Sequence, residues 1–150
     1  MATESDQTGG RPVDRLAIQD LVFTYNHALD TGDEELFVSL FVPAATNGPK
    51  VGVDAIRDAF RKTAAKYAEL HHLSSNLVVD FDGDQATGRS KALIFRSLPG
   101  EIADGNAPMY VDYDDVYVHT GQGWKFLSRS FRAADIPPAV VAPPQNRGGK

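Results

Sequence analysis

The sequence contains no cysteine, which excludes disulfide bonds, thiolate metal sites and a cysteine nucleophile. A chain without cysteine fits a reducing compartment, and we expect a cytoplasmic protein. The sequence also has no apolar run long enough to cross a bilayer. Its N-terminal stretch, MATESDQTGGRPVD, lacks the basic and then apolar pattern of a secretory signal. We therefore expect neither a membrane protein nor export by that route.

Positive charge is also sparse, since 15 Lys and Arg stand against 20 Asp and Glu for a formal net charge of -5. No basic stretch interrupts this balance, so nucleic acid is not expected as a partner. The sequence has no glycine-rich phosphate loop and no H-E-x-x-H helix. The acidic residues at 112–115 have no second group of ligands at a suitable spacing. We predict neither a metal site nor a cofactor.

The composition is that of an ordinary globular protein, with 42% hydrophobic and 23% charged residues in a chain of 150. This length suits one domain, and no internal repeat is visible. We predict a flexible N-terminal arm over residues 1–12, one domain over residues 13–135, and a Pro/Gly-rich C-terminal tail over residues 136–150.

The first half of the chain shows helical periodicity. Apolar residues recur at helical spacing from Asp14 onward, and Thr31-Gly32 is a natural helix stop. Asp33 is suited to cap a short helix over residues 36–41. After an irregular stretch over residues 43–50, a third amphipathic helix is predicted over residues 54–67.

The second half changes to the pattern of β-strands. Residues 73–81, 87–96, 109–119 and 124–132 are rich in β-branched and aromatic side chains, and turn signals separate them at 82–84 and 121–123. Helices followed by antiparallel strands indicate an α+β fold in which the helices cover one face of the sheet.

Three polar residues occur inside apolar segments: Tyr25, Asp30 and His72. Burial of polar groups is unfavourable unless they are hydrogen-bonded or functional. If they meet in one cavity, Asp30 could orient the imidazole, His72 could act as a general base or acid, and Tyr25 could polarise an oxygen. Each residue also has a structural interpretation: Tyr25 as a core aromatic, Asp30 as a helix-end residue, and His72 as a strand histidine whose hydrogen-bonding groups already have partners in the fold.

Several motifs together resemble the SnoaL-like group of the NTF2-like superfamily, and in particular its scytalone dehydratase-like members. The resemblance covers about residues 13–132. The segments that carry it are Ala17-Ile18-Gln19-Asp20-Leu21 through Tyr25, Ala28 to Asp33, Gly52 to Ile56, His71 to Asn76 and Gly123 to Phe126. It implies a cone-shaped α+β barrel, with N-terminal helices packed on a curved antiparallel sheet. The barrel encloses a cavity with an Asp–His pair, and Asp30 and His72 fall on the matching positions.

The resemblance also implies an activity. Tyr25 precedes Asp30 by the interval found in the bile-acid dehydratase pattern. We expect a cofactor-independent lyase, such as a dehydratase, or an isomerase that acts by His–Asp proton transfer. The expected substrate is a hydroxylated cyclic, steroid-like or polyketide-derived small molecule. The alternative is a non-catalytic module of this fold that binds a small molecule or a protein partner.

Four further residues are candidates for substrate contact. Asn76 lies four residues after His72 and is therefore expected on the same strand face. Tyr113, Asp115 and His119 share one face of a later strand by alternation. The hexachlorocyclohexane dehydrochlorinase pattern places a functional arginine at about the position of His119, although exposure near the turn is an equally good interpretation of that residue.

The first long strand contains a conflict. If His72 and Asn76 both face the cavity, alternation turns the apolar residues of this strand to the other face. Those residues are Leu73, Leu77, Val79 and Phe81. Either a bulge near Ser74-Ser75 reverses the alternation, or another subunit covers that face. We expect a homo-oligomer, either a homodimer or a homotrimer.

Overall fold

The computed structural model describes residues 11–101 and 108–135. The predicted arm, except for its last two residues, and the predicted tail lie outside this part. The elements in chain order are α1 (Pro12–Thr31), α2 (Glu34–Ser39), β1 (Phe41–Asn47), β2 (Lys50–Val51), α3 (Val53–Lys66), β3 (Glu69–Asp82), β4 (Gln85–Ser97), β5 (Met109–Thr120) and β6 (Gly123–Asp135). The predicted α+β class is confirmed.

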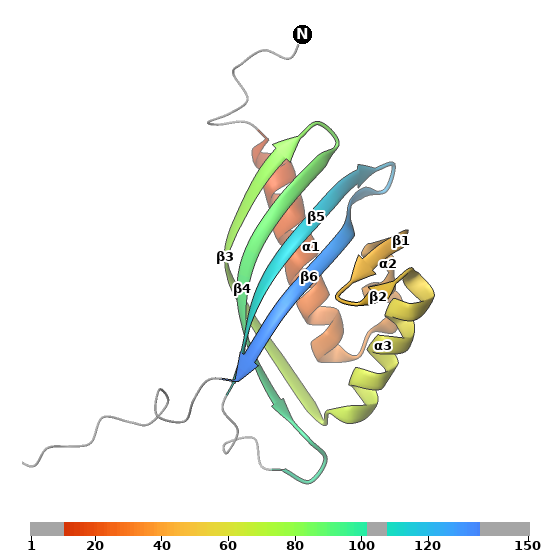
Figure 1. The fold of residues 1–150 in the computed structure, drawn as a ribbon, viewed down its shortest axis with the longest axis vertical. Helices are drawn as coiled ribbons and strands as arrows, with labels where there is room; N and C mark the ends of the chain where they lie inside the picture. Colours follow the sequence, from red (N-terminus) through yellow and green to blue (C-terminus); the bar gives the residue numbers. More distant parts are fainter. Residues whose placement is uncertain (1–10, 102–107, 136–150) are drawn as a thin grey trace, which may run out of the picture.

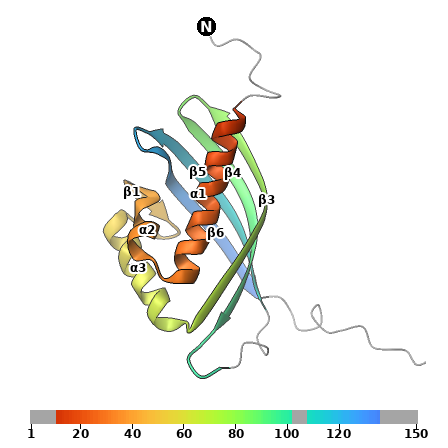
Figure 2. The same cartoon turned by 180° about the vertical axis from the view of Figure 1, so that it is seen from behind.

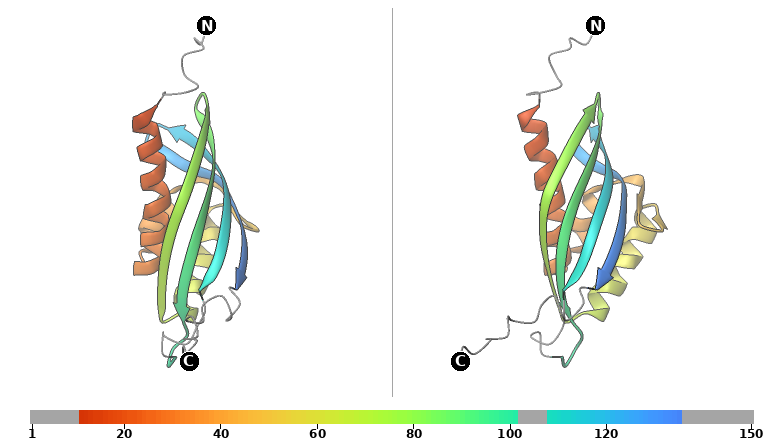
Figure 3. Two further views of the ribbon diagram at one scale, coloured as in Figure 1. Left: turned by 90° about the vertical axis from the view of Figure 1, so that its left-hand side faces the viewer. Right: turned by 60° about the vertical axis from the view of Figure 1, so that its left-hand side comes forward.

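One curved sheet forms the frame of the molecule, with strand order β2-β1-β6-β5-β4-β3. Neighbouring strands are antiparallel except for β1 and β6, which are parallel. The helix α1 runs along one face of the sheet, while α2 and α3 lie toward its β1–β2 end (Figures 1 and 2). Seen after a turn about the vertical axis, the sheet curves around the helices (Figure 3).

The long helix α1 is fixed at both ends. Pro12 occupies its first turn, where the missing N–H is not needed, and Gly32 ends it with a φ of 72°. Near its start, the Asp14 carboxylate accepts a hydrogen bond of 2.8 Å from the Trp124 indole N–H on β6. The Arg15 guanidinium donates to the carbonyl oxygen of Val79 on β3 at 2.8 Å. These bonds hold the helix against the sheet.

A bulge in β3 resolves the conflict in that strand. The β3–β4 register shifts between Ser75 and Val78, and Asn76 has a φ of 56°. The extra residue reverses the alternation of side chains. The apolar residues that follow it, Leu77, Val79 and Phe81, therefore pack in the core on the helix side, whereas Leu73, which precedes it, stays exposed. The bulge alternative is confirmed, and the homodimer or homotrimer stays a prediction.

A second bulge lies in β6. Tyr117 pairs with Phe126, whereas the preceding Val116 pairs with Ser128, so Leu127 has no partner in β5. Phe126 is buried before the bulge, and Arg129 is buried after it. Simple alternation from Phe126 would have turned Arg129 outward, but the bulge turns it into the core.

The expectation of an irregular stretch over residues 43–50 is wrong, because β1 and β2 occupy most of it. Pro43 and the Gly48-Pro49 pair suggested a loop. The strand tolerates Pro43 because the β1–β6 ladder is interrupted between Phe41 and Thr46, so the missing N–H of proline breaks no ladder bond there. The main core lies between α1, α2, α3 and the sheet. Within the described residues, no helix combines the length and apolar character needed to cross a membrane.

Candidate active site

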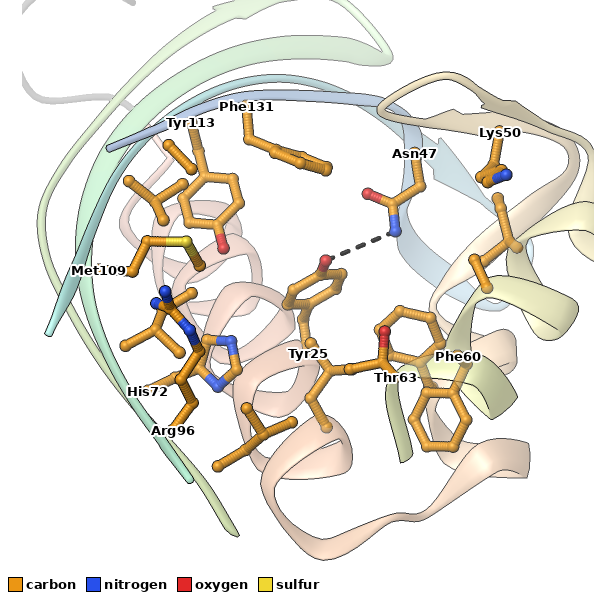
Figure 4. Close-up of a pocket in the computed structure, with 18 of the residues that line it drawn as sticks. Tyr25, Asn47, Lys50, Phe60, Thr63, His72, Arg96, Met109, Tyr113 and Phe131 are labelled. Atoms are coloured by element: carbon orange, nitrogen blue, oxygen red, sulfur yellow. Dashed lines mark hydrogen bonds between the residues drawn. The ribbon is translucent and has the colours of Figure 1, made fainter. Parts of the chain in front are cut away.

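A cavity of about 490 Å³ lies between α1, α3 and the inner face of the sheet. Figure 4 shows its polar side chains directed inward from several elements. Its wall is mostly apolar: Leu29, Phe37, Ile56, Ala59, Phe60, Leu70, Ile94, Met109, Val111, Phe131 and Ala133. Its polar members include Tyr25, Asn47, Thr63, His72 and Tyr113. A mostly apolar hollow with a few convergent polar groups is typical of a small-molecule site.

Asp30 and His72 are in direct contact at one wall of this cavity. The Asp30 carboxylate lies 2.5 Å from His72 Nδ1 and accepts a second hydrogen bond of 2.9 Å from the His72 backbone N–H. Asp30 is near the end of α1, and His72 is on β3, so the fold joins residues 42 positions apart. Because Nδ1 is held by Asp30 and the ring lines the cavity, Nε2 is the nitrogen available to a ligand.

The surroundings favour a neutral imidazole. The His72 side chain is only 4% exposed, and this burial lowers its pKa below the ordinary value. The neighbouring Asp30 carboxylate opposes that shift, and the Arg129 charge adds to it. A neutral ring with Nδ1–H bonded to a carboxylate has a free lone pair on Nε2, which is the state required of a general base.

Tyr25 and Asn47 form a second polar pair in the cavity. The Asn47 amide donates to the Tyr25 hydroxyl oxygen at 3.4 Å (Figure 4). Burial raises the pKa of Tyr25, while the Arg129 charge and the Asn47 hydrogen bond oppose the rise. Tyr25 is therefore protonated at neutral pH and can donate a hydrogen bond to a ligand oxygen.

Arg129 lies behind the two cavity tyrosines. Its guanidinium carbon is 4.2 Å from the ring centroid of Tyr25 and 3.7 Å from that of Tyr113. The side chain is 0% exposed, and its Nε is 3.2 Å from a carboxylate oxygen of Asp115. The other oxygen of Asp115 accepts a 2.8 Å hydrogen bond from the Tyr117 hydroxyl. The buried positive charge of Arg129 thus packs against the faces of both tyrosine rings, whose hydroxyl groups face the cavity.

A family model of the SnoaL-like domain matches residues 12–130. The chain belongs to the SnoaL-like family. This match covers most of the described part of the chain and includes Tyr25, Asp30 and His72. The expected NTF2-like architecture of this family, helices packed on one curved sheet, is the architecture observed. A search of curated protein sequences finds no match.

Solved structures share the SnoaL-like fold. A candidate scytalone dehydratase from Novosphingobium aromaticivorans is 26% identical with a TM-score of 0.72, and the match covers 83% of this chain and 89% of that one. A candidate aromatic ring hydroxylase from the same organism is 26% identical with a TM-score of 0.73, covering 84% and 96%. The protein LinA is 25% identical with a TM-score of 0.68, covering 88% and 98%.

Of the four predicted substrate contacts, Tyr113 lines the cavity and the other three do not. Asn76 does not, because the β3 bulge turns it outward and leaves it exposed, so its expected place on the same face as His72 is wrong. Asp115 is buried but faces Arg129 rather than the cavity. His119 is exposed and packs against the Trp124 ring, with a centroid distance of 5.2 Å, away from the cavity.

Sequence reasoning missed Arg129 and Asn47. An arginine in a predicted strand is ordinarily a surface residue, and its inward position depends on the unpaired Leu127. Asn47 lies in the stretch expected to be irregular. The one available signal was the polar Ser128-Arg129-Ser130 run between Leu127 and Phe131, since three polar residues in succession break the alternation and are compatible with a bulge. Within residues 11–101 and 108–135, no three potential metal-ligating side chains converge.

Proposed function

We propose that this SnoaL-like protein is a lyase that removes water from a hydroxylated cyclic small molecule. The observation that supports it best is the contact of 2.5 Å between Asp30 and Nδ1 of His72, whose ring lines a largely apolar cavity. The related structures add support, because two of them carry the names scytalone dehydratase and LinA, and a LinA type is a hexachlorocyclohexane dehydrochlorinase. The substrate class proposed is steroid-like or polyketide-derived.

In the proposed reaction, His72 removes a proton from the substrate and Tyr25 donates one to the leaving group. His72 Nε2 takes a proton from a carbon next to the one that bears the hydroxyl group. The electron pair of that C–H bond forms the C=C bond, the C–O bond breaks, and the departing oxygen takes the Tyr25 proton to leave as water. The proton held by His72 then returns to Tyr25 through solvent, which restores both residues.

The electrostatic surroundings suit these roles. Asp30 stabilises the imidazolium that forms during proton removal. Arg129, stacked on both tyrosine rings, stabilises the negative charge that develops on the Tyr25 oxygen. Tyr113 presents its hydroxyl to the same space and is proposed as a substrate contact.

The test is a screen of hydroxylated ring compounds for loss of water, measured by mass spectrometry. The neighbouring histidine provides a matched control, because the His71 side chain is 65% exposed. We expect His72→Gln to lower turnover by about 100-fold or more, while His71→Gln turns over like the unmodified protein.

Circular dichroism melting separates loss of chemistry from loss of fold in these variants. Undiminished turnover by His72→Gln would contradict the proposal. Binding of ring compounds without any turnover by the unmodified protein would favour the non-catalytic binding module instead.

A further inference from the structure

Asn47 carries a buried hydrogen-bond acceptor without a partner. Its amide nitrogen donates to the Tyr25 hydroxyl at 3.4 Å, but its Oδ1 atom is buried and makes no hydrogen bond. Figure 4 shows this oxygen turned toward the cavity side where Phe131 lies. A buried carbonyl oxygen without a donor is unfavourable, so this position is suited to a ligand that supplies one.

The same contact fixes the direction of the Tyr25 proton. Because the Tyr25 oxygen accepts from Asn47, its own O–H bond points elsewhere, and it donates no hydrogen bond to any residue that the structure describes. Figure 4 shows this hydroxyl between Asn47 on one side and His72 on the other. The pair thus offers the cavity one donor, Tyr25 O–H, and one acceptor, Asn47 Oδ1.

A single hydroxyl group of a ligand can bond to both the Tyr25 donor and the Asn47 acceptor. Its oxygen accepts from Tyr25, and its hydrogen is donated to Asn47 Oδ1. A halide, an ether oxygen or a ketone oxygen accepts from Tyr25 but leaves Asn47 Oδ1 unpaired. We propose that Tyr25 and Asn47 form a subsite specific for an alcohol hydroxyl. This inference rests on the proposed function and deepens it, because it identifies Asn47, together with Tyr25, as the group that recognises the leaving hydroxyl and discriminates against a halide.

The experiment measures binding by isothermal titration calorimetry in the His72→Gln protein, where turnover does not interfere. The probes are trans-2-decalol, its methyl ether and 2-decalone, which share one ring system. We expect the alcohol to bind about tenfold more tightly than either analogue, which corresponds to one net hydrogen bond. Adding Asn47→Leu should reduce this preference to within about twofold.

Two further variants test whether the preference for the alcohol depends on the Tyr25–Asn47 pair. Thr46→Val is the matched control, since it removes a neighbouring 3.0 Å hydrogen bond to Ser128 but lies outside the cavity lining, and it should keep the tenfold preference. Tyr25→Phe should lose the preference as Asn47→Leu does, so the test survives if one variant fails to fold.

Equal affinities for the three probes, no measurable binding of decalol, or a preference that persists in both Asn47→Leu and Tyr25→Phe would overturn the inference. None of these outcomes depends on catalysis, so failure here is distinguishable from failure of the proposed dehydration.

Discussion

Asp30→Asn is the substitution with the clearest expected consequences. The Asp30 carboxylate accepts from the His72 backbone N–H at 2.9 Å and contacts His72 Nδ1 at 2.5 Å. Asparagine has one oxygen and one NH₂ group, so only one of the two contacts can keep an acceptor. The backbone N–H can only donate and therefore retains the oxygen, which leaves the NH₂ group facing Nδ1.

That arrangement forces a change of tautomer in His72. Nδ1 must become an acceptor, so the ring hydrogen moves to Nε2, the nitrogen that faces the cavity. A protonated Nε2 has no lone pair and cannot act as a base. We expect turnover to fall by about 10²- to 10⁴-fold, the usual contribution of a general base.

The loss of stability should be moderate. The two side chains are 4% and 22% exposed, so the contacts are well shielded from water. Two charge-assisted hydrogen bonds become two neutral ones, each weaker by about 1 kcal/mol. The free energy of unfolding in urea should therefore fall by about 2 kcal/mol, and the protein should remain folded.

The tautomer is measurable without a substrate. Long-range ¹H–¹⁵N spectra distinguish Nδ1–H from Nε2–H rings, and the His72→Gln spectrum identifies the His72 signals among the four histidines of the chain. We expect Nδ1–H in the unmodified protein and Nε2–H in Asp30→Asn. An unchanged tautomer in Asp30→Asn, or a ring protonated at both nitrogens at neutral pH in the unmodified protein, would refute this reasoning.

Two further predictions concern stability. Arg129→Met leaves the Asp115 carboxylate buried without its counterion, so the free energy of unfolding should fall by about 3–5 kcal/mol, and adding Asp115→Asn should recover much of it in urea denaturation. Because the pKa of folded His72 is lowered, the unfolded chain binds a proton at higher pH than the native state does. Stability should therefore fall as pH decreases from about 6.5 toward the folded pKa, and this part of the pH dependence should vanish in His72→Gln.

Much of the fold could be predicted from periodicity. The long helix, the two shorter ones and the four long strands follow directly from helical and alternating patterns, because one face of each element is buried. The pair of Asp30 and His72 was also predictable, since both are polar residues in apolar segments and both match the family pattern.

The remaining site residues depend on irregularities that alternation does not reveal. One extra residue at the β3 bulge turns Asn76 outward, and one at the β6 bulge turns Arg129 inward. Each bulge moves the side chains that follow it to the opposite face of the sheet. No local sequence signal is strong enough to locate either bulge. Asn47 reaches the cavity only because β1 joins the sheet beside β6, a pairing set by tertiary contacts.

The pH dependence of kcat/KM for loss of water, measured on a substrate found in the screen, tests the role of His72 most directly. If neutral His72 removes the proton, the rate should fall on the acid side with an apparent pKa below about 6.5, and His72→Gln should lack this limb. A rate that stays constant through the acid range, or an identical acid limb in His72→Gln, would contradict proton removal by this imidazole.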